Sequence, residues 1–153
     1  MTRTIPCPKG EVPTIQAQAD ALEKEFRDFS DWTERYEHII ELGQALDPLP
    51  EELRRPEFEV PGCQSQVWLV CERADDGRLC FHGHSDSLIV RGLLAVLIRL
   101  CDRQRPEDIL AWDLAFLETI GLQQHLTPSR TNGFVAMWRK IQECAARAAG
   151  REP

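Results

Sequence analysis

Two extended segments joined by a tight turn constrain the fold of this chain more than any other feature. Residues 67–73 and 78–84 carry apolar and aromatic side chains typical of strands. Between them lies Ala74-Asp75-Asp76-Gly77, in which the Asp-Gly pair favours the positive backbone angles of a hairpin turn. The pattern predicts an antiparallel β-hairpin. Residues 56–62 before it are expected to be irregular or to form an edge strand.

Helical patterns precede the hairpin. After Thr14, apolar residues recur every three or four positions and predict a first helix. Asp31 and Glu34 have the spacing of an acidic capping box, which predicts a second helix. Pro50 is suited to the first turn of a short helix, because its fixed backbone angle is already helical.

Helical patterns also follow the hairpin. Ser85 or Asp86 is expected to cap a central core helix, and Pro106 and Asp113 to open two short helical turns. Thr127, followed by proline, is expected to cap the last helix. The residues expected to be buried on the central and last helices are Leu88, Ile89, Leu93, Val96, Leu97, Leu100, Phe134, Met137, Trp138, Ile141 and Ala145.

The order of these elements indicates the fold class. Helices, a small antiparallel sheet and further helices follow one another, without the alternation of strand and helix that a parallel sheet requires. We therefore expect an α+β fold in which helices pack on one face of a hairpin plus edge strand. A chain of 153 residues fits one domain. We place it at residues 14–148, between flexible segments at 1–13 and 149–153.

Charge and hydropathy exclude several classes of function. The chain has 25 acidic and 18 basic residues, a formal charge of -7, which argues against nucleic acid as a partner because such binding neutralises phosphates. The longest apolar run, residues 93–98, is far shorter than the roughly 20 residues of a membrane helix. Residues 1–11 lack the apolar segment of a secretory signal. We expect a cytoplasmic protein without a membrane partner.

The cysteines are expected to be free thiols. A reducing compartment and a core of adequate size make a disulfide framework unnecessary. Cys71, Cys101 and Cys144 lie in strand or helix patterns and are expected to be structural. The six cysteines of the chain are Cys7, Cys63, Cys71, Cys80, Cys101 and Cys144.

Cys63 is the cysteine best placed for chemistry. It lies in the stretch VPGCQSQ at 60–66, which combines turn-forming residues with polar neighbours and runs directly into the first predicted strand. Local context leaves two interpretations open, a reactive thiol on an exposed loop or an inert small hydrophobe at the start of a strand. No Lys, Arg or His adjoins Cys63 in sequence, so nothing local predicts a lowered thiol pKa.

The heptapeptide GCQSQVW at 62–68 resembles the active-site segment of the SufE family, the sulfur acceptors of cysteine desulfurases in iron-sulfur cluster assembly. One departure is His84, where many relatives carry aspartate. Further stretches resemble family landmarks in the same order, over roughly residues 28–145. They are Trp32 with Tyr36, IIELG at 39–43, Leu49-Pro50, Gly83 with Ser85-Asp86, IVRGL at 89–93 and HLTPSR at 125–130.

This resemblance implies a SufE/IscU-like fold and a role in sulfur transfer. Cys63 would take persulfide sulfur from a SufS-type cysteine desulfurase, stimulate that enzyme and relay the sulfur to a downstream iron-sulfur scaffold. The chain would act as a sulfurtransferase-type accessory protein whose activity depends on its partner. It would carry no cofactor of its own, since pyridoxal phosphate would belong to the desulfurase. A homodimer is left open.

Other candidate residues are assigned lesser roles. The resemblance and the loop context give them a part in supporting the Cys63 loop or in binding the partner, while capping and ordinary surface positions remain the simpler interpretation for several of them. These residues are Gly62, Gln64, Ser65, Gln66, Asp86, His125 and Arg130.

A metal site is the remaining chemical alternative. Cys80, His82 and His84 share one face of the second predicted strand, and a thiolate with two imidazoles can bind zinc. A fourth ligand is not evident, so we expect no metal. The rival function is a non-catalytic adaptor, or a zinc-binding regulatory module, that docks to a partner protein without taking sulfur.

Overall fold

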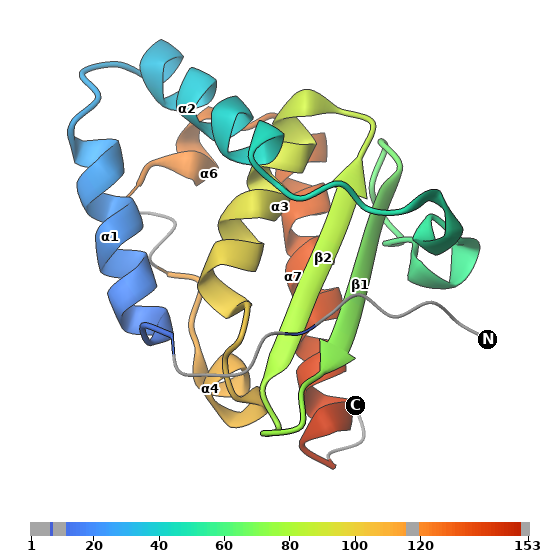
Figure 1. Cartoon of the computed structure of the whole chain (residues 1–153). Coiled ribbons are helices and arrows are strands. Elements are labelled where there is room, and N and C mark those ends of the chain that lie inside the picture. The colour runs from blue at the N-terminus through green and yellow to red at the C-terminus, as the bar shows by residue number, and fades with distance from the viewer. Residues whose placement is uncertain (1–6, 8–11, 116–119, 151–153) are drawn as a thin grey trace.

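The fold is built around a two-stranded antiparallel sheet. The structure is a computed structural model that describes residues 7, 12–115 and 120–150. Strand β1 (Val67–Arg73) pairs with β2 (Leu79–Ser85), which begins and ends one residue later than predicted. An isolated bridge between Glu59 and Trp68 adds a short edge beside β1. The hairpin is therefore confirmed (Figure 1), while the predicted edge strand is reduced to this single bridge.

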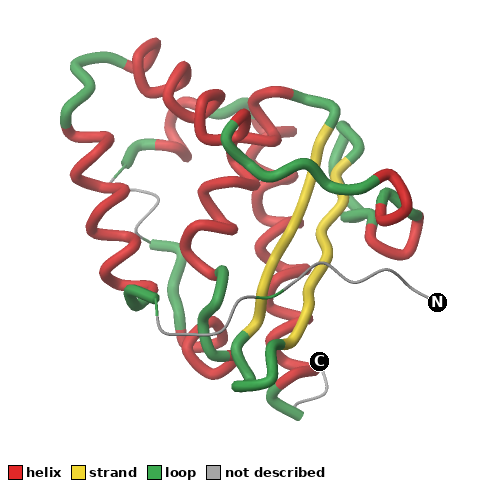
Figure 2. Tube along the Cα trace, in the orientation of Figure 1, coloured by secondary structure: helices red, strands yellow, loops and turns green. Residues whose placement is uncertain are grey.

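Helices make up most of the remaining described chain (Figure 2). Side-chain caps explain where several begin, because a free oxygen accepts from an unpaired N–H of the first turn. Asp31 accepts from Glu34 and Thr127 from Arg130, so these two predicted caps are confirmed. Thr14, which was not predicted as a cap, accepts from Ala17 at the start of the first helix. The helices are α1 (Ile15–Arg27), α2 (Trp32–Gln44), η1 (Glu51–Leu53), η2 (Pro56–Phe58), α3 (Leu88–Cys101), α4 (Pro106–Ala111), α6 (Leu122–His125) and α7 (Pro128–Ala148).

The helices cover one face of the hairpin. In Figure 1, α7 (red) passes behind the two strands and α3 (yellow) lies next to them, and contacts join α3 to β2 and α7 to β1. Helix α2 crosses α3, and α1 packs against α3 at the side away from the sheet. Leu69 and Phe81, which face this layer, are almost completely buried. The predicted α+β architecture with helices on one sheet face is confirmed.

The opposite face of the hairpin has a small apolar cover of its own. Trp68 and Val70 alternate with the inward-facing residues of β1 and therefore point to the other side. Leu49, Leu53 and Phe58, from the segment containing η1 and η2, pack against them. The segment before the Cys63 loop is thereby held against the sheet.

Two details of α3 differ from the prediction. Its cap is Ser87, whose hydroxyl accepts from Val90, because Ser85 still belongs to β2 and its hydroxyl bonds to Gln66. Leu88 was expected to be buried but is 60% exposed. It is the first residue of the helix, and the buried stripe begins one position later, at Ile89. The short helical turn expected after Asp113 falls partly on residues 116–119, which lie outside the described residues.

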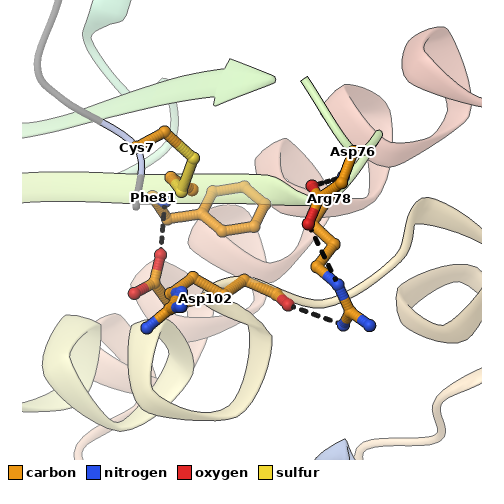
Figure 3. Close-up of a disulfide and its surroundings, with 7 residues drawn as sticks. Cys7, Asp76, Arg78, Phe81 and Asp102 are labelled. Atoms are coloured by element: carbon orange, nitrogen blue, oxygen red, sulfur yellow. Dashed lines mark hydrogen bonds and ion pairs between the residues drawn. A yellow bond between two sulfur atoms is a disulfide. The ribbon is translucent and has the colours of Figure 1, made fainter. Parts of the chain in front are cut away.

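Four cysteines are paired, so the free-thiol expectation was wrong for them. Cys7 bonds to Cys80 on β2, and Cys71 on β1 bonds to Cys144 on α7, each across 73 positions of sequence. Figure 3 shows the disulfide of Cys7 next to Phe81. The expectation failed because pairing depends on which side chains the fold brings together, and that is not readable from spacing.

No helix in the described part of the chain is long and apolar enough to cross a membrane.

An ion-pair network fastens α1 to the core. Glu25 accepts two hydrogen bonds from the Arg99 guanidinium, at 2.8 and 2.9 Å, and its carboxylate lies 3.2 Å from His38 Nε2. The hydrogen bonds from Arg99, followed by that from His38, hold the pKa of Glu25 below its usual value, against the opposing effect of burial. A carboxyl whose pKa is lower in the folded state stabilises the fold above its unfolded pKa. That contribution is lost as the pH falls through the folded pKa.

Replacement of Arg99 by methionine is expected to lower the free energy of unfolding at neutral pH by about 1 kcal/mol, since solvent screens a pair this exposed. The loss of stability on acidification should also become smaller, because Glu25 would then titrate closer to its unfolded pKa. Urea unfolding at neutral and acidic pH measures both effects. Arg27→Met, which removes the more exposed pair of α1 with Glu23, serves as the control. An unchanged acid dependence in Arg99→Met would contradict the assignment.

Candidate functional site

The loop that carries Cys63 is anchored at both ends. At its start the Val60 N–H donates to the Val67 carbonyl at 2.8 Å, which closes the loop at its base. At its end the Gln66 carbonyl accepts from the Ser85 hydroxyl at 2.9 Å. These bonds leave residues 61–65 as a short projection between fixed points. Such a loop can change conformation without disturbing the sheet.

Helix α7 packs against the loop at residues 61–65. Gly62 has φ +88°, in the left-handed region that favours glycine, and a Cβ built there would lie 3.6 Å from Ala136 Cβ. The next residue, Cys63, donates from its Sγ to the Gly133 carbonyl at 3.6 Å. The glycine turn therefore directs the sulfur onto the α7 backbone.

The resting environment of Cys63 favours the neutral thiol. The side chain is half-buried, and this burial raises the pKa of the Cys63 thiol. The Gly133 carbonyl accepts from an S–H group but offers nothing to a thiolate. Because the thiolate is the nucleophile, sulfur in this position is poorly reactive. The Cys63 side chain is not fully exposed, so the structure is compatible with a loop that shelters the sulfur at rest.

Cys63 borders two hollows. The inner hollow, of about 320 Å³, lies between the loop, α3 and α7, and the outer hollow, of about 450 Å³, lies beside the segment that leads into the loop. Besides residues of the loop itself, the inner hollow is lined by Ser87, Val90, Leu93, Thr127, Ser129, Arg130, Gly133, Phe134 and Met137. The outer hollow is lined by Pro56, Glu59, Val60, Pro61, Gly62, Cys63, Ser65 and Lys140.

The structure brings most of the predicted loop residues to these hollows. Gln64 and Arg130 line the inner hollow, Gly62 lines the outer one, and Ser65 borders both. The Arg130 guanidinium lies 6.0 Å from the centre of the Tyr36 ring on α2, a cation–π distance. The roles predicted for these residues in partner binding remain predictions.

Three further candidates lie outside both hollows. The Gln66 N–H donates to the Asp86 carboxylate at 3.2 Å, so Asp86 supports the end of the loop. His125 lies on α6, where its ring stacks on Trp32 at 4.3 Å between centroids. This contact joins α6 to α2 and does not bring His125 to the sulfur.

The residues considered for zinc are not arranged to bind it. Cys80 is committed to its disulfide with Cys7 and offers no thiolate. His82 and His84 remain on the strand face, where burial lowers the pKa of both imidazoles. Among the described residues, no three or more His, Cys, Asp or Glu side chains gather in a group that could hold a metal ion.

Sequence reasoning missed part of the site. Its periodic patterns predicted Leu93, Phe134 and Met137 as buried residues, and these also border the inner hollow. Gly133 and Lys140 gave no local signal, because their importance comes from where α7 meets the loop. Only the packing of α7 against β1 brings them close to Cys63.

The fold and the loop together define a class, a small α+β protein that presents one half-buried thiol beside an internal hollow. Over residues 20–145 the sequence matches the SufE family, described as an Fe-S metabolism associated domain. The chain therefore belongs to the SufE family and is associated with iron-sulfur metabolism. It is also similar to the solution structure of a hypothetical protein from Thermus thermophilus. The TM-score is 0.72 at 18% identity, over 87% of this chain and 96% of that one, which shows a shared fold.

Proposed function

We propose that Cys63 accepts sulfur from the persulfide of a SufS-type cysteine desulfurase and relays it to an iron-sulfur scaffold. The observation that carries this proposal is a free thiol on an anchored loop, half-buried against a hollow large enough to receive a sulfur atom. Membership of a family associated with Fe-S metabolism supports the same chemistry. The accessory role implies a protein that accelerates its partner by removing the sulfur product.

The transfer is a thiol–disulfide type of exchange. The Cys63 thiolate attacks the terminal sulfur of the donor persulfide, a new S–S bond forms at Cys63, and the donor cysteine leaves as a thiolate. The sulfur keeps its oxidation state and its proton, so the step needs no outside oxidant or reductant. Pyridoxal phosphate is required only to form the donor persulfide, and we assign it to the desulfurase.

The inner hollow is suited to protect the loaded sulfur. Exposed persulfide is open to attack by cellular thiols, so a loop that returns to α7 would shield it. The apolar lining of this hollow comes from α3 and α7, through Leu93, Phe134 and Met137 among others. We expect the free protein to keep Cys63 inward and the partner to draw it out.

Docking of the desulfurase is proposed at the surface around this loop. Leu88, 60% exposed, directly follows Ser87, which lines the inner hollow, so an exposed apolar side chain is available near the rim of that hollow. Arg130 and Asp86 add one charge of each sign to the same surroundings. A transient complex of modest area fits these features. His125 would act on this surface only through its stacking on Trp32.

The proposal is tested by the mass of the protein after incubation with desulfurase and cysteine under non-reducing conditions. Four of the six cysteines are paired and Cys101 is buried, so one accessible thiol is available. We expect a gain of one sulfur atom per chain, located on the peptide that contains Cys63 and removed by dithiothreitol. Protein alkylated beforehand serves as the control and should gain nothing. A native chain that stays unmodified beside an active desulfurase would contradict the proposal and favour the adaptor.

A further inference from the structure

One stripe of α7 runs along the whole Cys63 loop. Gly133, Ala136 and Lys140 are spaced by three and four positions and therefore lie on one face of the helix. The Gly133 carbonyl accepts from Cys63 Sγ, and Ala136 lies under Gly62. Lys140 donates from its Nζ to the Glu59 carbonyl at 3.5 Å. The stripe thus begins at the resting sulfur and ends at an ammonium group.

The sulfur has space to move from one end of this stripe towards the other. Cys63 borders the outer hollow as well as the inner one, and Lys140 lines the outer hollow. Gly133 and Lys140 are about 10 Å apart along the helix axis at about 1.5 Å per residue. Helical side chains lean towards the N-terminus, so the Lys140 side chain spans part of that distance. A modest outward turn of the loop at Gly62 would bring the Cys63 sulfur across the remaining distance to the Lys140 ammonium.

Lys140 is also an uncommitted cation. Among the residues that the structure describes, it has no carboxylate within ion-pair distance, and its one polar contact is the long bond to the Glu59 carbonyl. The other charged side chains near the loop are Glu59, Arg130 and Asp86, and neither Arg130 nor Asp86 lines the outer hollow. Glu59 shares the outer hollow, Arg130 lies at the inner hollow over Tyr36, and the Asp86 carboxylate is bonded to Gln66.

The geometry points to Lys140 as the positioning residue that stabilises the Cys63 thiolate once the loop has swung into the outer hollow. The inner position holds a neutral thiol against a carbonyl oxygen, and the outer position places the same sulfur beside a positive charge. The two hollows would then be a resting position and a reactive position of one loop. The importance of this for sulfur transfer rests on the function proposed above, but the assignment concerns the thiol itself and can be tested without a partner.

The test is the rate of alkylation of the free, non-reduced protein by iodoacetamide as a function of pH. In Lys140→Gln we expect the midpoint of the rate profile to move upward by about half a unit to one unit, since an opposite charge close to a thiolate favours ionisation. At pH values below the midpoint this shift slows alkylation by about threefold to tenfold. Lys140→Arg should restore the native midpoint, and Arg139→Gln, which removes an exposed charge from the adjacent position, should leave it unchanged.

A purely structural role for Lys140 gives a different result. If the lysine only holds the loop through Glu59, its removal would loosen the loop, expose the thiol and raise the alkylation rate at every pH, with no upward shift of the midpoint. That outcome, or a native profile in Lys140→Gln, would overturn the assignment. A failure of the desulfurase experiment would leave the alkylation profile as it is, so the two proposals fail independently.

Discussion

Replacement of Cys63 by serine is expected to abolish the stimulation of desulfurase turnover. A serine hydroxyl does not ionise near neutral pH and cannot hold a sulfane sulfur, so the partner would keep its own persulfide and wait for a reductant to remove it. Folding should be little affected, because the side chain is half-buried and its bond to the Gly133 carbonyl can be made by a hydroxyl. The measurement is the rate of alanine production by the desulfurase, with and without the variant.

The control for this experiment is the other free cysteine. Cys101 is fully buried on α3, where burial and the nearby Asp102 charge raise the pKa of its thiol, so it is chemically inert. Cys101→Ala removes a sulfur without touching the loop and should retain stimulation, at a cost of about 1–2 kcal/mol in unfolding free energy for a small cavity. Full stimulation by Cys63→Ser would instead identify a regulator that acts by docking alone.

Local chemistry accounts for the parts of the fold that were predicted correctly. The Asp76-Gly77 turn, the caps at Asp31 and Thr127 and the apolar stripes each depend on a few neighbouring residues, so a sequence carries them directly. The same holds for the loop around Cys63, where Gly62 adopts the positive φ that a turn requires.

Long-range geometry accounts for what was missed. The two disulfides each join residues 73 positions apart, and no local pattern distinguishes Cys80 in a disulfide from Cys80 as a metal ligand. Lys140 resembles any half-exposed helical lysine until β1 and α7 place it beside the loop. Residues whose importance comes from two elements meeting are therefore the ones that sequence reasoning overlooks.

The crossing of α2 and α3 is the place where one added methyl group should have the largest effect on folding. Gly43 on α2 and Gly92 on α3 face each other there, and a Cβ on Gly43 would lie 2.6 Å from the Gly92 nitrogen. A Cβ on Gly92 would overlap the carbonyl oxygen of Ile39 and lie 2.6 Å from its Cγ2. Since the obstacle on each side includes backbone, a side-chain rotation cannot remove it, and the helices would have to separate.

Gly92→Ala is accordingly expected to destabilise the protein by about 3 kcal/mol, the upper part of the range for overpacked cores. In an open helix the same change would stabilise by up to about 1 kcal/mol, because alanine has the higher helical propensity. Gly133→Ala offers that comparison on α7, where the new methyl would meet only the Cys63 sulfur at an ordinary 3.6 Å. Urea unfolding of both variants decides between the two expectations. If Gly92→Ala were as stable as Gly133→Ala, the backbones of α2 and α3 could not approach as closely as this packing requires.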